Sequence, residues 1–90
     1  MEYSVHAEAQ AEAVAVELRI AAQPLDEALQ EFSRQSGIQV IFFSGVTAGI
    51  QSPSVKGKYT VAAALAALLA DSGLTFRLIN ARTVEIRKAD

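Results

Sequence analysis

One short pattern occurs twice in this 90-residue sequence, and this duplication is the feature that most limits how the chain can fold. QSGIQV at residues 35–40 is matched by DSGLTF at residues 71–76. At the same offset, apolar residues ahead of the first copy align without a gap with apolar residues ahead of the second. The aligned pairs are Leu25 with Val61, Ala28 with Ala64, Leu29 with Leu65 and Phe32 with Leu68. Such a regular alignment predicts a duplicated supersecondary unit.

Residues 15–43 have the pattern of a β-α-β unit. Apolar and charged residues alternate in VAVELRI, which predicts a half-buried strand. Pro24 is expected at the first helical position, because its fixed φ is helical and its missing N–H would have no partner there. Apolar residues then recur at i, i+3, i+4 and i+7, which is the spacing of one helical stripe. Gly37 is expected to end this helix, and IQVIFF to follow as a strand.

The second unit, residues 55–88, comes after a predicted loop at residues 44–54, which holds two glycines and a proline. Its elements are expected in the order strand VKGKYT, helix 61–70, strand LTFRLI and strand TVEIR. Thr60 is an acceptable N-cap for the helix. The last two strands are expected to pair as a hairpin.

The domain organisation follows from these units. Residues 1–14 have no sustained pattern and are interpreted as a flexible leader, in which the single histidine, His6, is expected to have no role. Residues 15–88 are expected to form one domain. Its fold class is predicted as α+β.

Two architectures suit this order of elements. In a sandwich, the two helices lie between two small sheets; in a ferredoxin-like fold, both helices cover one face of a single sheet. The helix at residues 61–70 contains only Val, Ala and Leu. Because a helix that is apolar all round is expected to be buried all round, the sequence favours the sandwich over the ferredoxin-like alternative.

Composition and motifs argue against several classes of function. The chain has no cysteine and a net charge of −2, with single, scattered Lys and Arg residues, so we expect no nucleic-acid partner. VAAALAALLA, the longest apolar run, has about half of the roughly 20 residues that a membrane span needs, so no direct membrane insertion is expected. No nucleophile-base, metal-ligand or phosphate-loop motif is present. The chain is therefore predicted not to be an enzyme and to hold no cofactor or metal.

Several short motifs together resemble a known family. They are I-x-A-Q-P-L at residues 20–25, A-L at 28–29, S-G-I at 36–38, G-x-Y at 57–59 and L-L-x-x-S-G-L at 68–74. In this order and spacing the chain is similar to the secretin and TonB N-terminus short domain, over about residues 16–87. The resemblance implies two β-α-β units whose helices are held between two small sheets. It also implies a periplasmic location in a Gram-negative bacterium.

The resemblance further implies a function. The best match is the signalling domain that precedes the plug and barrel of TonB-dependent siderophore or haem receptors, parts that this chain lacks. Such a domain reports ligand occupancy to the periplasmic domain of an inner-membrane anti-sigma regulator, which controls transcription of iron or haem uptake genes. The alternatives are the ring-assembly domain of a secretin and the C-terminal region of an anti-sigma regulator. We expect the isolated domain to be a monomer.

A domain without catalytic groups acts through its surface, and an exposed strand edge is one such surface. The strand at residues 54–59 follows a loop and carries outward lysines, so it is the candidate partner-binding strand. The predicted contact residues are Gln51, Ser52, Ser54, Val55, Lys56 and Lys58, with Val55 as an apolar anchor. The opposing interpretations are an ordinary solvated edge, or a small-molecule sensor, which would need a concave pocket.

Overall fold

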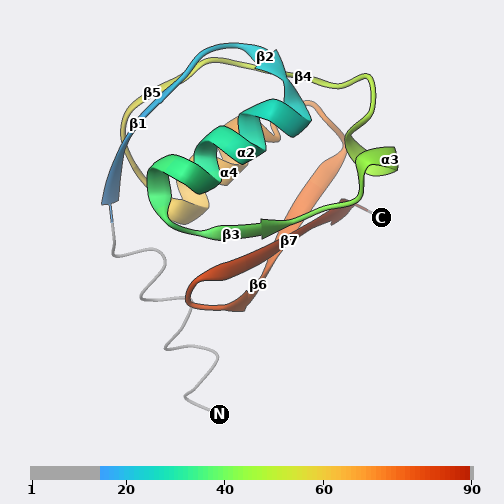
Figure 1. The fold of residues 1–90 in the computed structure, drawn as a ribbon. Helices are drawn as coiled ribbons and strands as arrows, with labels where there is room; N and C mark the ends of the chain where they lie inside the picture. The colour runs from blue at the N-terminus through green and yellow to red at the C-terminus, as the bar shows by residue number, and fades with distance from the viewer. Residues whose placement is uncertain (1–14, 90) are drawn as a thin grey trace.

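The structure is a computed structural model that describes residues 15–89; the predicted leader and His6 lie outside these residues. Figure 1 shows the order of the elements along the chain. They are β1 (Ala15–Ile20), β2 (Gln23–Pro24), α2 (Leu25–Ser36), β3 (Gln39–Ile41), α3 (Ser44–Thr47), β4 (Gln51–Ser52), β5 (Val55–Thr60), α4 (Val61–Leu68), β6 (Leu74–Asn80) and β7 (Thr83–Lys88).

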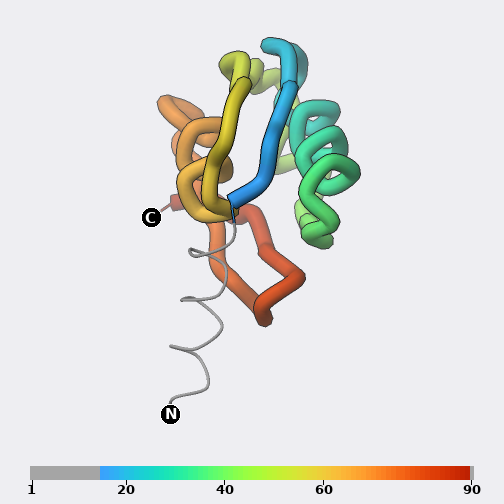
Figure 2. The backbone as a smooth tube through the Cα atoms, turned by 90° about the vertical axis from the view of Figure 1, so that its left-hand side faces the viewer, coloured from blue at the N-terminus to red at the C-terminus, as the bar shows by residue number. Residues whose placement is uncertain are grey.

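The strands of residues 15–89 form two main sheets and one short pairing. β1 and β5 make a two-stranded antiparallel sheet, and β2 pairs with β4 over two residues. The second main sheet has the order β3-β7-β6, in which β3 and β7 are parallel and β6 and β7 form the predicted hairpin. In Figures 1 and 2, α2 and α4 lie side by side, with the β1–β5 sheet on one side and the three-stranded sheet on the other. The predicted sandwich is therefore confirmed, and the ferredoxin-like alternative is wrong.

The core explains the duplicated pattern. Every residue of the aligned apolar set is buried, so the two copies supply matching faces of α2 and α4. Leu18 and Ile20 close the core from the two-stranded sheet, and Val84 and Ile86 close it from the three-stranded sheet. Each such side chain contributes roughly 1.5–3 kcal/mol when it is fully buried.

The start of α2 differs from the prediction. Pro24 is not the first helical residue: with φ −52° and ψ 139° it is extended, and it pairs with Gln51 in the short β2–β4 ladder. The N–H of Leu25 donates to the carbonyl of Ile50 at 2.8 Å, so this ladder fixes the point at which the helix begins. The end of α2 is as predicted, because Gly37 is left-handed (φ +77°).

Helix α4 is shorter and less buried than predicted. It ends at Leu68, and turns fill the chain up to Gly73. Thr60 is its N-cap as expected, since the N–H of Ala63 donates to Thr60 Oγ1 at 3.1 Å. Ala63 and Ala66 are exposed, so α4 is not buried all round as predicted, although the sandwich arrangement is present. Because the two helices lie side by side between the sheets, the side of α4 that faces away from α2 is not covered by other elements of residues 15–89. Alanine is small enough to be exposed there at little cost.

The segment predicted as a loop, residues 44–54, contains α3 and β4. The preceding strand β3 covers only residues 39–41 of the predicted IQVIFF. The chain turns into α3 directly after Phe43, whose side chain is 73% exposed. Thr47 is buried and anchors α3 against the rest of the domain.

Candidate protein-binding edge

The β1–β5 sheet places charged side chains on its outer face and apolar side chains on the core. Because side chains alternate along a strand, Leu18 and Val55 face the helices, whereas Arg19 and Lys56 face outward. Arg19 lies opposite Lys56 in the register, and Glu17 lies opposite Lys58. These four outward residues are exposed. A shallow hollow of about 470 Å³ lies on this face beside Gly57.

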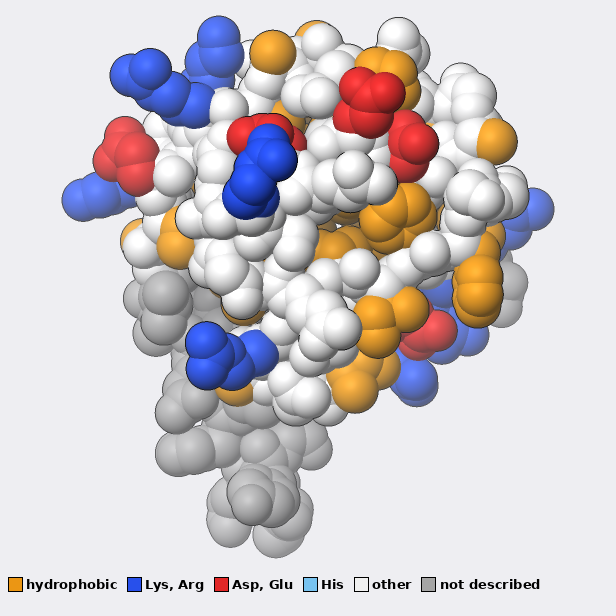
Figure 3. Space-filling view, viewed as in Figure 1, with side chains coloured by type: hydrophobic (Ala, Val, Ile, Leu, Met, Phe, Trp, Pro, Cys, Tyr) orange, Lys and Arg blue, Asp and Glu red, His pale blue; other side chains and the backbone are white. Residues whose placement is uncertain are grey.

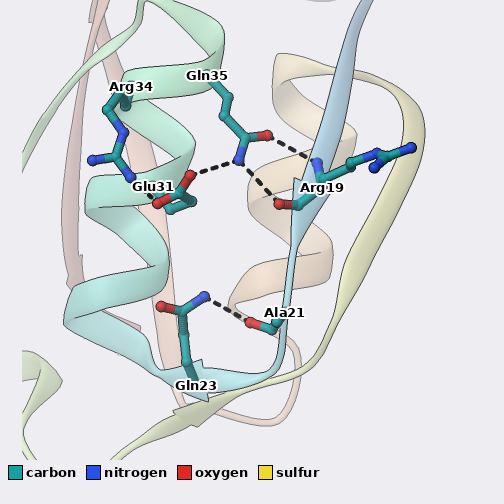
Figure 4. A network of polar contacts seen from close by, with 6 residues as sticks. All are labelled: Arg19, Ala21, Gln23, Glu31, Arg34 and Gln35. Atoms are coloured by element: carbon teal, nitrogen blue, oxygen red, sulfur yellow. Dashed lines mark hydrogen bonds and ion pairs between the residues drawn. The ribbon is translucent and has the colours of Figure 1, made fainter.

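The outer edge of β1 is closed at Arg19 by a side chain of α2. Gln35 Oε1 accepts from the backbone N–H of Arg19 at 2.8 Å, and Gln35 Nε2 donates to the Arg19 carbonyl at 3.0 Å (Figure 4). The side-chain amide of Gln35 thus forms hydrogen bonds with both the N–H and the carbonyl of Arg19, as the backbone of a neighbouring strand would. Gln35 Nε2 also donates to Glu31 Oε2 at 2.8 Å, and Glu31 is ion-paired with Arg34. This network holds the Gln35 side chain against β1.

The bonds of Gln35 reveal how the backbone of β5 is oriented. Residues opposite one another in an antiparallel pair alternate between hydrogen-bonded and non-hydrogen-bonded pairs. Since both backbone groups of Arg19 point to α2, Arg19 and Lys56 form a non-hydrogen-bonded pair. The N–H and C=O of Lys56 therefore point away from β1, and by alternation so do those of Lys58. No other strand within residues 15–89 pairs with this side of β5.

The structure divides the six predicted contact residues into two groups. Gln51, Ser54, Lys56 and Lys58 are exposed at β4, β5 and the link between them. Ser52 and Val55 are only 3% and 1% exposed.

The expectation that Val55 is an apolar anchor for a partner is therefore corrected: strand alternation turns it into the core. The Ser52 hydroxyl donates to the Pro53 carbonyl at 3.2 Å and is likewise turned away from solvent. The four exposed residues remain a prediction.

Sequence reasoning missed two parts of this surface. Gln35 was not recognised, because nothing in the sequence shows which backbone groups a helical glutamine reaches across a layer. The exposed flank of α4, with Ala63 and Ala66, was expected to be buried.

Other parts of the surface offer less defined features. An open hollow of about 440 Å³ lies between the start of α2 and α3, and Asp26 is the one ionisable side chain that lines it. In Figure 3, acidic and basic side chains are mixed over α2, and apolar side chains gather below it. Ile41 and Phe43, on and beside β3, are exposed. Residues 15–89 contain no group of three His, Cys, Asp or Glu side chains placed to hold a metal.

None of the helices in the described part of the chain has the length and apolar character needed to cross a membrane.

Comparisons with known proteins agree on one family. The model of the secretin and TonB N terminus short domain matches residues 38–89. A search of curated proteins found no significant match.

Among solved structures, the ferripyoverdine receptor of the outer membrane of Pseudomonas aeruginosa, bound to ferripyoverdine, is similar with a TM-score of 0.79 and 33% identity. The match covers 84% of this chain and 10% of that one. The periplasmic signalling domain of the outer-membrane iron transporter PupA from Pseudomonas putida is similar with a TM-score of 0.75 and 27% identity. Here the match covers 83% of this chain and 90% of that one.

The chain thus spans about a tenth of the length of the receptor that it matches and nearly the whole of an isolated signalling domain. The shared fold, the family match and the extent of these alignments lead to one conclusion: the chain belongs to the family of secretin and TonB N terminus short domains, with the fold of the N-terminal signalling domains of TonB-dependent receptors.

Proposed function

We propose that this chain is the periplasmic signalling domain of a TonB-dependent outer-membrane receptor. In this role it transmits the receptor's ligand occupancy to the periplasmic domain of an inner-membrane anti-sigma regulator, and so controls transcription of iron or haem uptake genes. The observation that carries the proposal is the alignment with 90% of the PupA signalling domain. The plug and barrel of the same receptor would bind the siderophore or haem.

The contact with the regulator is assigned to the exposed edge of β5. An edge strand offers unpaired backbone groups to another polypeptide. Within residues 15–89, no strand pairs with the outward N–H and C=O groups of Lys56 and Lys58 on β5. Gln51 and Ser54 lie directly before this strand and supply side-chain donors and acceptors. Signal transfer by this route needs no chemical step, only a change in how accessible the edge is within the receptor.

The first test of this proposal measures binding. The 90-residue chain is titrated by calorimetry into the periplasmic domain of each anti-sigma regulator of the source bacterium. We expect one regulator to bind in a one-to-one complex, and the unbound chain to sediment as a monomer. Heat of binding from none of the regulators would contradict the proposal.

The second test separates signalling from transport. Deletion of residues 15–89 from the parent receptor should leave ligand uptake intact, because ligand is bound by the plug and barrel, and should abolish ligand-dependent transcription of the uptake genes. A deletion strain that still induces these genes normally would contradict the proposal.

A further inference from the structure

We propose that the regulator contributes an extended segment that pairs with β5 as a third strand, with acidic side chains facing Lys56 and Lys58, and that Gln35 favours this edge by occupying the backbone groups of Arg19 on the opposite edge of the same sheet. This inference rests on the proposed function, because it specifies how the regulator is recognised.

The backbone of β5 is prepared for strand addition. The N–H and C=O groups of Lys56 and Lys58 point outward from the two-stranded sheet, and residues two apart on a strand are separated by about 6.6–6.8 Å. An extended segment presents its own groups at this same spacing, so it can pair with both residues without any rearrangement of β5. On the β1 edge, the backbone groups of Glu17 point outward by the same alternation, but those of Arg19 are already bonded to Gln35 at 2.8 and 3.0 Å. An added strand could therefore not pair with both residues there.

The charges on the outer face select the occupant. Lys56 and Lys58 are both exposed, and the neighbour opposite Lys56 is Arg19, a like charge. No carboxylate therefore lies opposite Lys56 in the sheet. An acidic side chain on an added strand, directly beside Lys56, would form the favourable cross-strand pair that β1 does not provide. The alternation of side chains places the next outward residue of the segment beside Lys58, which already has the carboxylate of Glu17 opposite it in the sheet.

The exposed side of α4 provides a surface against which the inward-facing side chains of an added strand would pack. In Figure 2, α4 lies on the β5 side of the middle layer and α2 on the β1 side. The exposed positions of α4, Ala63 and Ala66, carry side chains of one carbon, with Ala62 and Ala67 half-buried at the margins. A third strand beside β5 would extend the sheet over this flank, so its inward residues are expected to be apolar and to meet alanine. The segment therefore has acidic residues alternating with apolar ones.

Amide hydrogen exchange tests the pairing directly. In the free 90-residue chain, we expect the amides of Lys56 and Lys58 to exchange much faster than that of Gly57, which faces β1. With the regulator's periplasmic domain bound, the two lysine amides should slow by at least about tenfold, because they become hydrogen-bonded within a sheet. Bound regulator without slowing at these amides, or with slowing at the edge of β3 instead, would overturn the proposal.

Charge and flank are tested with matched variants. Lys56→Glu and Ala66→Glu each add negative charge where the acidic segment would lie, and we expect each to weaken binding by about tenfold or more. Gln30→Glu is the control, since Gln30 is exposed on α2, away from β5. Equal affinity for all three variants and the parent chain would overturn the assignment of this surface.

The role of Gln35 is tested by opening the other edge. In Gln35→Ala, the Arg19 amide should exchange at least about tenfold faster, because its acceptor is lost. The unpaired β1 edge should then promote self-association that the parent chain does not show in sedimentation. Gln30→Ala is the control on the same helix. Unchanged exchange at Arg19 together with unchanged sedimentation would show that Gln35 does not close the edge.

These outcomes distinguish the two proposals. If no regulator binds the parent chain, the proposed function and this inference both fail. If a regulator binds but the amides of Lys56 and Lys58 keep their exchange rates, strand addition fails and the proposed function stands.

Discussion

A glutamine side chain carries one carbonyl acceptor and one NH₂ donor, the same pair of groups that a peptide unit offers to a strand edge. Gln35 uses both on Arg19, so a single residue of α2 satisfies two backbone groups of β1. The third bond, to Glu31, uses the second amide hydrogen and fixes which end of the amide faces which backbone group. A residue of α2, in the layer next to the β1–β5 sheet, therefore closes the β1 edge at Arg19.

Backbone conformation at single residues gives a prediction about stability. Gly37 ends α2 with φ +77°, and a Cβ placed there would meet no atom within 4 Å. Gly37→Ala is therefore strained only through its backbone, and we expect it to lower the free energy of unfolding by about 1 kcal/mol in urea denaturation. Gly45→Ala is the control, because Gly45 has equal space and no positive φ. Equal stability of the two variants would contradict this account of how α2 ends.

At the scale of elements, α4 shows both the strength and the weakness of sequence patterns. Its buried residues, Val61, Ala64, Leu65 and Leu68, follow the helical spacing that the sequence predicted. Its exposed alanines could not be predicted from the sequence. A solvent-exposed helix face is normally recognised by its polar residues, but in α4 all the remaining positions are alanine. In the same way, proline is a residue type that favours the first helical position, yet the pairing of Pro24 with Gln51 keeps Pro24 extended.

The two faces of α4 predict opposite responses to the same substitution. Ala64 is fully buried beside α2 and the sheets, so Ala64→Leu should overpack the core and lower the free energy of unfolding by about 1–3 kcal/mol. Ala66 is exposed, and Ala66→Leu should change it by no more than about 0.5 kcal/mol. Urea denaturation of both variants measures the difference. Equal losses would mean that α4 is enclosed on every side.

At the scale of the whole molecule, the two repeats are interlocked. Each main sheet pairs a strand of the first unit with a strand of the second: β1 with β5, and β3 with β7. The sequence predicted the two units and the hairpin, because these depend on local patterns and spacing. It did not predict which strands pair between the units, because this depends on contacts between residues far apart in the chain. The strand at residues 54–59 was predicted as an exposed edge from its position after a loop and its lysines.

Interlocked units predict cooperative unfolding. Neither unit can complete a main sheet alone, so the described domain should unfold in one transition with an enthalpy near 60 °C of about 50 kcal/mol, from roughly 0.7 kcal/mol per residue. Calorimetric and van't Hoff enthalpies should agree. Two resolved transitions in scanning calorimetry would show that the repeats fold independently.

The central claim is that the domain signals through a contact at the open edge of β5. The most direct measurement is an NMR titration of the isotope-labelled 90-residue chain with the periplasmic domain of the regulator. We predict that the largest shifts map to residues 54–58 and to the exposed flank of α4, with residues 74–80 of β6 unaffected. Shifts confined to β6, or an unchanged spectrum with every regulator tested, would contradict the claim.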